Sequence, residues 1–192
     1  MRPEDTQRLR QAAVAFSQLL RSHDIPHAFH GDLLVALVAR KPLCDEMACI
    51  VENGQRHAFR RVRDALVTSD DFRTVHSPWT NRLHVTYTDV IPAIEFEILP
   101  AGETGPRRLT SNTVMKIQGV PFLTVTEYVR AKLTSWIIRR LDLDAHDLMY
   151  VLGRYWNNVD ANRIPESDMN VFVTENLEAA PPWAAIRRKY EM

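Results

Sequence analysis

Residues 27 to 39, His-Ala-Phe-His-Gly-Asp-Leu-Leu-Val-Ala-Leu-Val-Ala, contain a strand, a tight turn and a short helix in succession. The extended piece His27–His30 reaches Gly31, and Asp32 then caps an apolar helix over residues 33–39, because an Asp side chain satisfies free helix amides. Lys41-Pro42 ends this helix. The segment therefore predicts a strand that enters a helix directly through a glycine turn.

The flanking sequence supplies the rest of a mixed architecture. Residues 4–22 place apolar side chains at three- and four-residue spacing, which predicts a helix with one buried stripe. Further periodicities predict, in chain order, a strand at 44–51, a helix at 55–68, strands at 72–77, 82–88, 93–99 and 113–118, and helices at 124–137 and 145–156. We expect an α/β (α+β) fold: a mixed twisted sheet with flanking helices over residues 1–122, followed by a C-terminal helical cap over residues 123–192 that packs on this core.

Composition narrows the classes of partner. The chain has 24 Lys and Arg against 24 Asp and Glu, a net charge of zero, and 45% apolar residues. This balance argues against a nucleic-acid or anionic-membrane partner, because both are usually met by an excess of basic residues. No apolar run approaches a membrane span, and the charged amino-terminal residues do not resemble a secretion signal, so we expect a cytoplasmic protein. Cys44 and Cys49 are expected to be free thiols, since their odd spacing in one strand points them to opposite faces.

Acidic residues gather on two of the predicted strands. Alternation places Asp45, Met47 and Cys49 on one face of the first strand, and Glu95 and Glu97 on one face of the other. If these strands are neighbours, both sets of side chains line one pocket. The plainer interpretation is that Asp32 is only a helix cap and that the two Glu side chains face water.

These residues resemble the nucleotidyltransferase fold of polymerase-β type, in particular its small stand-alone fungal and abortive-infection-like members. Gly31 matches the turn that holds the triphosphate, Asp45 the first acid of the Asp-x-Asp pair, and Glu97, or less well Glu95, the third acid. The loop that begins at Pro100 is also similar to the fungal members. Later matches are Lys132, Leu133, Arg139, Asp144, Asp147 and Leu148, which resemble the helices that close the nucleotide pocket. The resemblance implies acids that hold two divalent ions.

Two positions depart from the family pattern. Met47 stands where the second Asp is expected, and a thioether is a poor Mg²⁺ ligand. Glu46 is expected to project from the opposite face and so cannot replace it. Asp32 stands where the family has a small residue against phosphate oxygens, and its charge repels them. We therefore expect a degenerate metal site, with no metal and no cofactor.

Histidine and basic residues offer further chemistry. His30 or His84 beside a carboxylate would form a proton-transfer pair, although either ring could simply be satisfied by a backbone carbonyl. A zinc site from His27, His30 and Asp45 is disfavoured, because His-x-x-His in a strand points the rings to opposite sides.

Two basic groups could meet an anion. Lys132 and Arg139 lie one above the other on a predicted helix and are the better candidate, with a structural role as the alternative. The stripe of Arg56, Arg60 and Arg63 is more typical of a solvated helix face.

The leading hypothesis is a small-molecule-binding protein that uses the pocket of a degenerate nucleotidyltransferase fold. If the protein is an enzyme, we expect metal-independent acid–base chemistry such as isomerisation, cyclisation or dehydration. Its candidate catalytic residues are Asp32, Asp45, Glu97, His30 and His84, and its candidate ligand-binding residues are Gly31, Met47, Glu95, Lys132 and Arg139. One alternative is an active nucleotidyltransferase that uses Mg²⁺ and a nucleoside triphosphate; another is a non-catalytic interaction module. The sequence does not define an oligomeric state.

Overall fold

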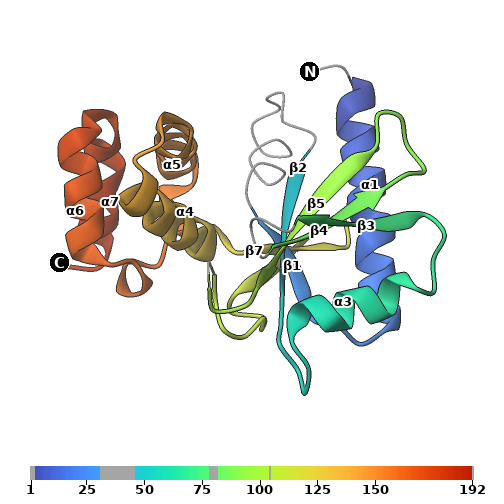
Figure 1. The fold of residues 1–192 in the computed structure, drawn as a ribbon. Helices are drawn as coiled ribbons and strands as arrows, with labels where there is room; N and C mark the ends of the chain where they lie inside the picture. The colour runs from blue at the N-terminus through green and yellow to red at the C-terminus, as the bar shows by residue number, and fades with distance from the viewer. Residues whose placement is uncertain (1–2, 31–45, 78–81, 104, 192) are drawn as a thin grey trace. The chain divides into compact units, whose positions relative to one another are not determined.

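The computed structural model describes residues 3–30, 46–77, 82–103 and 105–191 (Figure 1). The chain divides into two compact units, Met1–Leu123 and Thr124–Met192. In chain order the elements of the first unit are α1 (Pro3–Ser22), β1 (His27–His30), β2 (Glu46–Val51), α3 (Ala58–Leu66), β3 (Phe72–Ser77), β4 (Arg82–Tyr87), β5 (Ile94–Pro100), β6 (Val114–Ile117) and β7 (Val120–Leu123). The predicted helix at 33–39 and residues 44 and 45 of the predicted strand lie outside the described residues.

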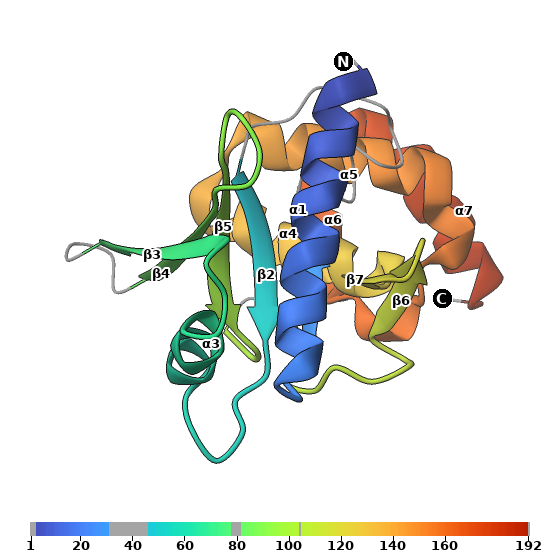
Figure 2. The ribbon, with the colours of Figure 1, turned by 90° about the vertical axis from the view of Figure 1, so that its right-hand side faces the viewer.

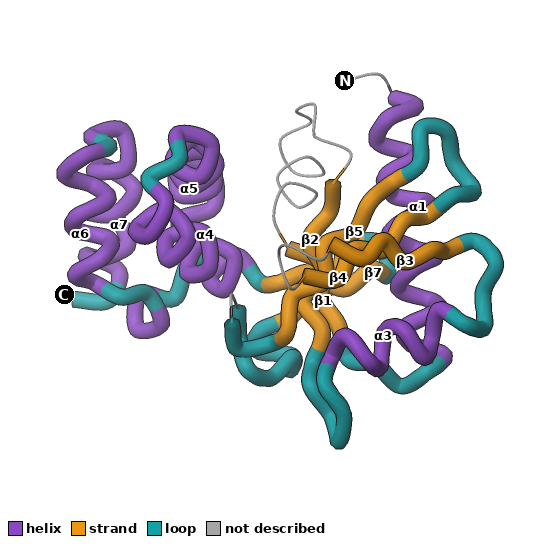
Figure 3. Tube along the Cα trace, in the orientation of Figure 1, coloured by secondary structure: helices purple, strands orange, loops and turns teal. Residues whose placement is uncertain are grey.

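The strands of the first unit, orange in Figure 3, form one mixed sheet. Their order across the sheet is β3-β4-β5-β2-β1-β7-β6. β2 runs parallel to β5 and β1 runs parallel to β7, whereas the other neighbouring pairs are antiparallel. The prediction of a mixed sheet with flanking helices is confirmed. The parallel pairing of β2 with β5 is the feature that brings residues of the two acidic segments close together.

The core of the first unit lies between α1, α3 and one face of the sheet (Figure 2). The ring of Phe16 on α1 packs against Phe96 of β5 at a centroid distance of 4.6 Å and against Phe72 of β3 at 5.4 Å. β5 alternates strictly, with Ile94, Phe96 and Ile98 buried and the residues between them partly exposed. This alternation separates an apolar face, covered by helices, from a more polar one.

The strand β7 is not among the elements that the sequence pattern predicts. It forms a hairpin with β6 through Gln118 and Gly119, whose φ angles of 51° and 85° are those of a tight two-residue turn that matches the strand twist. β7 has four residues, includes Pro121 and directly precedes a helix. Its short length and its proline concealed the period of two on which strand prediction rests.

The second unit is helical. Its helices are α4 (Val125–Arg139), α5 (Asp142–Tyr155), α6 (Glu166–Glu175) and α7 (Ala180–Lys189). The Thr124 side chain accepts a hydrogen bond from the backbone N–H of Glu127 and so caps α4. Trp136 of α4 packs edge-on against Phe172 of α6 at a centroid distance of 4.8 Å. The prediction that the chain becomes helical from residue 124 is confirmed.

The structure also bears on the expected lack of a membrane-spanning helix and on the expected free cysteines. Over the described ranges, the helices are all too short or too polar to cross a lipid bilayer. Cys49 is a free, fully buried thiol, and burial raises its pKa because a thiolate would lose its hydration. Cys44 lies outside the described residues.

Candidate functional site

Three predicted site residues lie in one row across the sheet. His30 of β1 pairs with Ala48 of β2, Ala48 pairs with Glu97 of β5, and Glu97 pairs with His84 of β4. Residues in register share a face of the sheet, and neighbouring strands lie about 4.8 Å apart, so the row spans about 14 Å from His30 to His84. This row lies on the face opposite to the one that Phe96 shares with α1.

Glu95 and His84 form the closest polar contact on this face. His84 Nδ1 lies 2.7 Å from Glu95 Oε1, although its direction is not that of a regular hydrogen bond. The His84 side chain is 17% exposed and that of Glu95 is 46% exposed. An imidazole held against a carboxylate, with one side open to solvent, is an arrangement suited to proton transfer.

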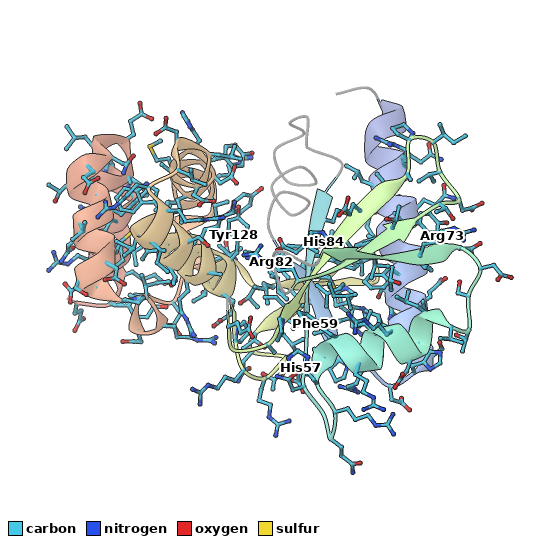
Figure 4. The ribbon with its side chains drawn as sticks, viewed as in Figure 1. His57, Phe59, Arg73, Arg82, His84 and Tyr128 are labelled. Carbon is cyan, nitrogen blue, oxygen red and sulfur yellow. The ribbon has the colours of Figure 1, made fainter. Side chains whose placement is uncertain are left out.

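Glu97 is ion-paired with Arg82, two residues before His84 on β4. The Glu97 carboxylate is largely buried, whereas the Arg82 side chain is about half exposed. Figure 4 labels both Arg82 and His84 on β4. Sequence reasoning missed Arg82, but the signal was present, because alternation along residues 82–88 places it on the same face as His84.

Met47 does not lie on this face. It is 1% exposed and its register partner is Phe96, whose ring packs on Phe16 in the core. The residue of β2 that stands beside Glu97 is Ala48. The expectation that Met47 shares a pocket face with Glu95 and Glu97 is therefore wrong, because Met47 stands in register with Phe96, between the two glutamates, and alternation turns it to the opposite face.

The remaining family-like positions of the first unit are Gly31, Asp32 and Asp45, which lie outside the described residues. Glu46 begins β2, and its backbone is in register with that of Glu95. Within the part of the chain that the structure describes, no three His, Cys, Asp or Glu residues are grouped so that they could hold a metal ion.

Lys132 and Arg139 come together in the second unit, around Asp144. Lys132 Nζ lies 3.0 Å from Asp144 Oδ1 and 3.0 Å from Asp147 Oδ2, and Arg139 Nη2 lies 2.9 Å from Asp144 Oδ2. The Lys132 side chain is 9% exposed. Carboxylates of α5 thus already neutralise the cations of α4, so this cluster is an internal ion-pair network that joins the two helices.

The arginines of the predicted stripe lie in two environments. Arg56, which precedes α3, is ion-paired with Asp64 of α3 at 3.1 Å, and both side chains are exposed. Arg60 and Arg63 border a cavity of about 400 Å³ at the start of α3, where Figure 4 labels His57 and Phe59. Glu103 also lines this cavity, so its charge is mixed rather than purely basic.

Comparison with known proteins tests the fold. No protein-family model matches the sequence, and no curated protein matches it. The structure is similar to an antigenic nucleotidyltransferase-like protein from Paracoccidioides brasiliensis, with 15% identity, 92% of each chain covered and a TM-score of 0.67. It is also similar to a putative nucleotidyltransferase from H. pylori, with 14% identity, 95% of this chain and 81% of that chain covered, and a TM-score of 0.57. The chain thus has the nucleotidyltransferase-like fold that its sequence resembles.

Proposed function

We propose that this chain binds a small organic molecule on the polar face of β4 and β5 and performs metal-independent acid–base chemistry there. The observation that supports this most directly is the contact of 2.7 Å between His84 Nδ1 and Glu95 Oε1. The reactions that need only such groups and a shaped site are isomerisation, cyclisation and dehydration.

Each side chain has a distinct task in this proposal. The Glu95 carboxylate beside Nδ1 favours the neutral tautomer that carries its proton there, which leaves Nε2 of His84 to take a proton from the substrate or return one. Arg82 balances the charge of Glu97 next to this pair, so a neutral or singly charged substrate can approach without meeting two free carboxylates. His30 lies on the same row, two strands from Glu97, and provides a second imidazole about 10 Å away.

Asp32 and Asp45 remain in the proposed catalytic set on sequence grounds. Both lie in the segment that the resemblance aligns with the nucleotide pocket. Met47 leaves the set of ligand-binding residues, because it is buried in the core.

An NMR fragment screen tests the site for a substrate that is still unidentified. For each fragment that binds, shifts of the backbone amides map the contact, and we expect them to cluster on residues 82–87 and 94–99. His84→Gln removes the imidazole while keeping a polar side chain, and should weaken binding of these fragments. His23→Gln is the matched control, since His23 is exposed and bonds to Thr68 away from this face. Fragments that shift only other residues, or that bind equally to His84→Gln, would contradict the proposal.

Nucleotidyl transfer is the second candidate, because the chain has a nucleotidyltransferase-like fold in which β2, which follows Asp45 in the sequence, runs parallel to β5, which carries Glu97. In that case Asp45 and Glu97 would hold Mg²⁺, which would supply charge stabilisation for the transferred phosphoryl group. The described geometry does not fit this well, since Glu97 is already ion-paired with Arg82. Calorimetric titration with ATP, with and without Mg²⁺, separates the two. Magnesium-dependent binding that Asp45→Ala abolishes would favour nucleotidyl transfer over acid–base chemistry.

A further inference from the structure

A second cavity lies in the first unit, beside the amino-terminal end of β1. It has a volume of about 490 Å³, within the range of small-molecule sites. It is bordered by the end of α1, the hairpin of β6 and β7, and the loop before β6. His27 lines it, and His27 and His30 are three residues apart on one strand, so the cavity lies about 10 Å along β1 from the row of His30. It is therefore separate from the proposed acid–base site.

The charged side chains that line the cavity are all basic over the described residues. Ile25, Leu109, Val114 and Pro121 provide apolar walls, and the cationic side chains are Arg21 and Lys116. None of the described residues that line the cavity is an Asp or a Glu. An aliphatic surface with positive charge at its border favours an organic anion that has an apolar body.

His27 contributes no charge to this cavity. Its Nδ1 lies 2.8 Å from the Ile25 carbonyl oxygen and its Nε2 lies 2.9 Å from Ser17 Oγ. Burial, together with the nearby Arg21 charge, lowers the pKa of His27 to about 4 in spite of the hydrogen bond to Ile25. The ring is therefore neutral near pH 7, with its proton on Nδ1 and Nε2 accepting from Ser17.

Arg21 is held in a defined position at the cavity. Its Nη2 donates to the Gly119 carbonyl oxygen at 2.9 Å and to Ser17 Oγ at 2.9 Å, and its Nε donates to Ser17 Oγ at 3.2 Å. Over the described part of the chain these bonds leave Nη1 with no acceptor. The guanidinium is thus oriented before any ligand arrives, which reduces the entropy lost on binding.

Lys116 of β6 and the loop before β6 form the remaining border of the cavity. Lys116 is in register with Pro121 across the hairpin, and both border the cavity. The loop that carries Leu109 is fixed by Thr113, whose hydroxyl accepts from the Thr110 N–H at 2.8 Å and donates to the Arg108 carbonyl oxygen at 2.9 Å. The apolar wall is therefore formed in the free protein.

We infer that this cavity is a binding site for a small aliphatic carboxylate, with the carboxylate on Arg21 and Lys116 and the hydrocarbon chain against Ile25, Leu109 and Val114. The bond to Arg21 is charge-assisted and the acid group needs no counterion from solvent. The site does not depend on the proposed acid–base function.

Hexanoate is the probe, and hexanamide is its uncharged analogue of nearly the same shape. NMR titration of the full chain at millimolar ligand should show saturable shifts of the backbone amides around the cavity, including Thr110, Val114 and Gly119. Hexanamide should bind at least about tenfold more weakly, because it lacks the charge-assisted bonds. Lys116→Glu should weaken hexanoate binding by a similar factor and hardly affect hexanamide.

Lys116 is the decisive position, since its side chain is exposed and its substitution leaves the core intact. Arg21→Met tests the second cation, with folding checked by circular dichroism because Arg21 also holds the hairpin. Lys189→Met, an exposed lysine of the second unit, is the matched control and should bind hexanoate as the unchanged protein does. The inference is overturned if hexanoate shifts no cavity amide, if hexanamide binds equally well, or if Lys116→Glu retains full hexanoate affinity.

Discussion

The Glu95 carboxylate reaches diagonally across the sheet to His84, with Oε1 2.7 Å from Nδ1, although the backbone partner of Glu95 is Thr86. Diagonal neighbours on one face are within reach of long side chains. Glu97, whose backbone partner is His84, pairs diagonally as well, with Arg82. The two acids of β5 are thus each displaced by two residues along β4, which keeps like charges apart and pairs every acid with a basic partner.

The contact between Glu95 and His84 predicts the tautomer of the imidazole. A carboxylate close to Nδ1 favours the neutral form that carries its proton there, whereas the Nε2–H form would set a lone pair against the charge. Long-range ¹H–¹⁵N correlation spectra at high pH should show His84 mainly as the Nδ1–H tautomer. In Glu95→Gln this preference should be lost or reduced. A ring with its proton on Nε2 in the unchanged protein would contradict the proposed catalytic arrangement.

Replacement of Met47 separates a core role from a pocket role. Met47→Asp buries a carboxylate with no partner beside Phe96, so it should lower the free energy of unfolding by at least about 3 kcal/mol and create no Mg²⁺ site. Met47→Leu nearly conserves volume and should cost less than about 1.5 kcal/mol. Urea denaturation measures both. A stable Met47→Asp protein that gains magnesium-dependent nucleotide binding would show that the side chain faces the pocket.

The buried ion-pair network of the second unit predicts a structural role for Lys132. Lys132→Met leaves Asp144 and Asp147 without their shared ammonium, and should destabilise the protein by about 3–5 kcal/mol. Arg139→Met is the control: its side chain is 51% exposed, and the change should cost at most about 1 kcal/mol. Thermal and urea unfolding report the difference. Equal stability of both variants would make Lys132 a ligand-binding candidate again.

The elements that could be predicted from the sequence are those in which apolar residues repeat regularly at the spacing of a helix or a strand. α1 has six apolar residues on one stripe, and β5 alternates without exception, so both appear near the expected bounds. The resemblance to nucleotidyltransferases was carried by the order of motifs and is confirmed at the level of fold. The short strand β7 was missed because one of its four residues is Pro121.

The site was harder to predict than the fold, because it depends on register and on partners. A shift of one residue reverses the face of a strand, so sequence spacing alone placed Met47 with the acids although it is buried and in register with Phe96. Spacing also cannot reveal that Lys132 meets carboxylates from another helix. Arg82 could have been found, since it alternates with His84, but its pairing with Glu97 depends on strand order.

The buried His27 predicts a specific pH dependence of stability. Its pKa is about 4 in the folded protein and 6.5 when exposed, so between these values the unfolded chain binds the extra proton. Stability from the neutral ring is fully present above pH 6.5 and decreases as the pH falls toward 4. The loss over this window is about 3 kcal/mol, from about 1.4 kcal/mol per pH unit.

His27→Gln removes this proton while allowing an amide to bond to Ile25 and Ser17, whose atoms His27 contacts at 2.8 and 2.9 Å. The free energy of unfolding of His27→Gln should therefore vary less between pH 6.5 and pH 4 than that of the unchanged protein, by roughly the 3 kcal/mol that linkage assigns to the ring. His23→Gln, at an exposed position, should keep the full pH dependence. Parallel slopes for His27→Gln and the unchanged protein would mean that His27 binds its proton equally well in the folded and unfolded chains, so that its pKa is not lowered and the cavity beside it gains a third positive charge below about pH 6.5.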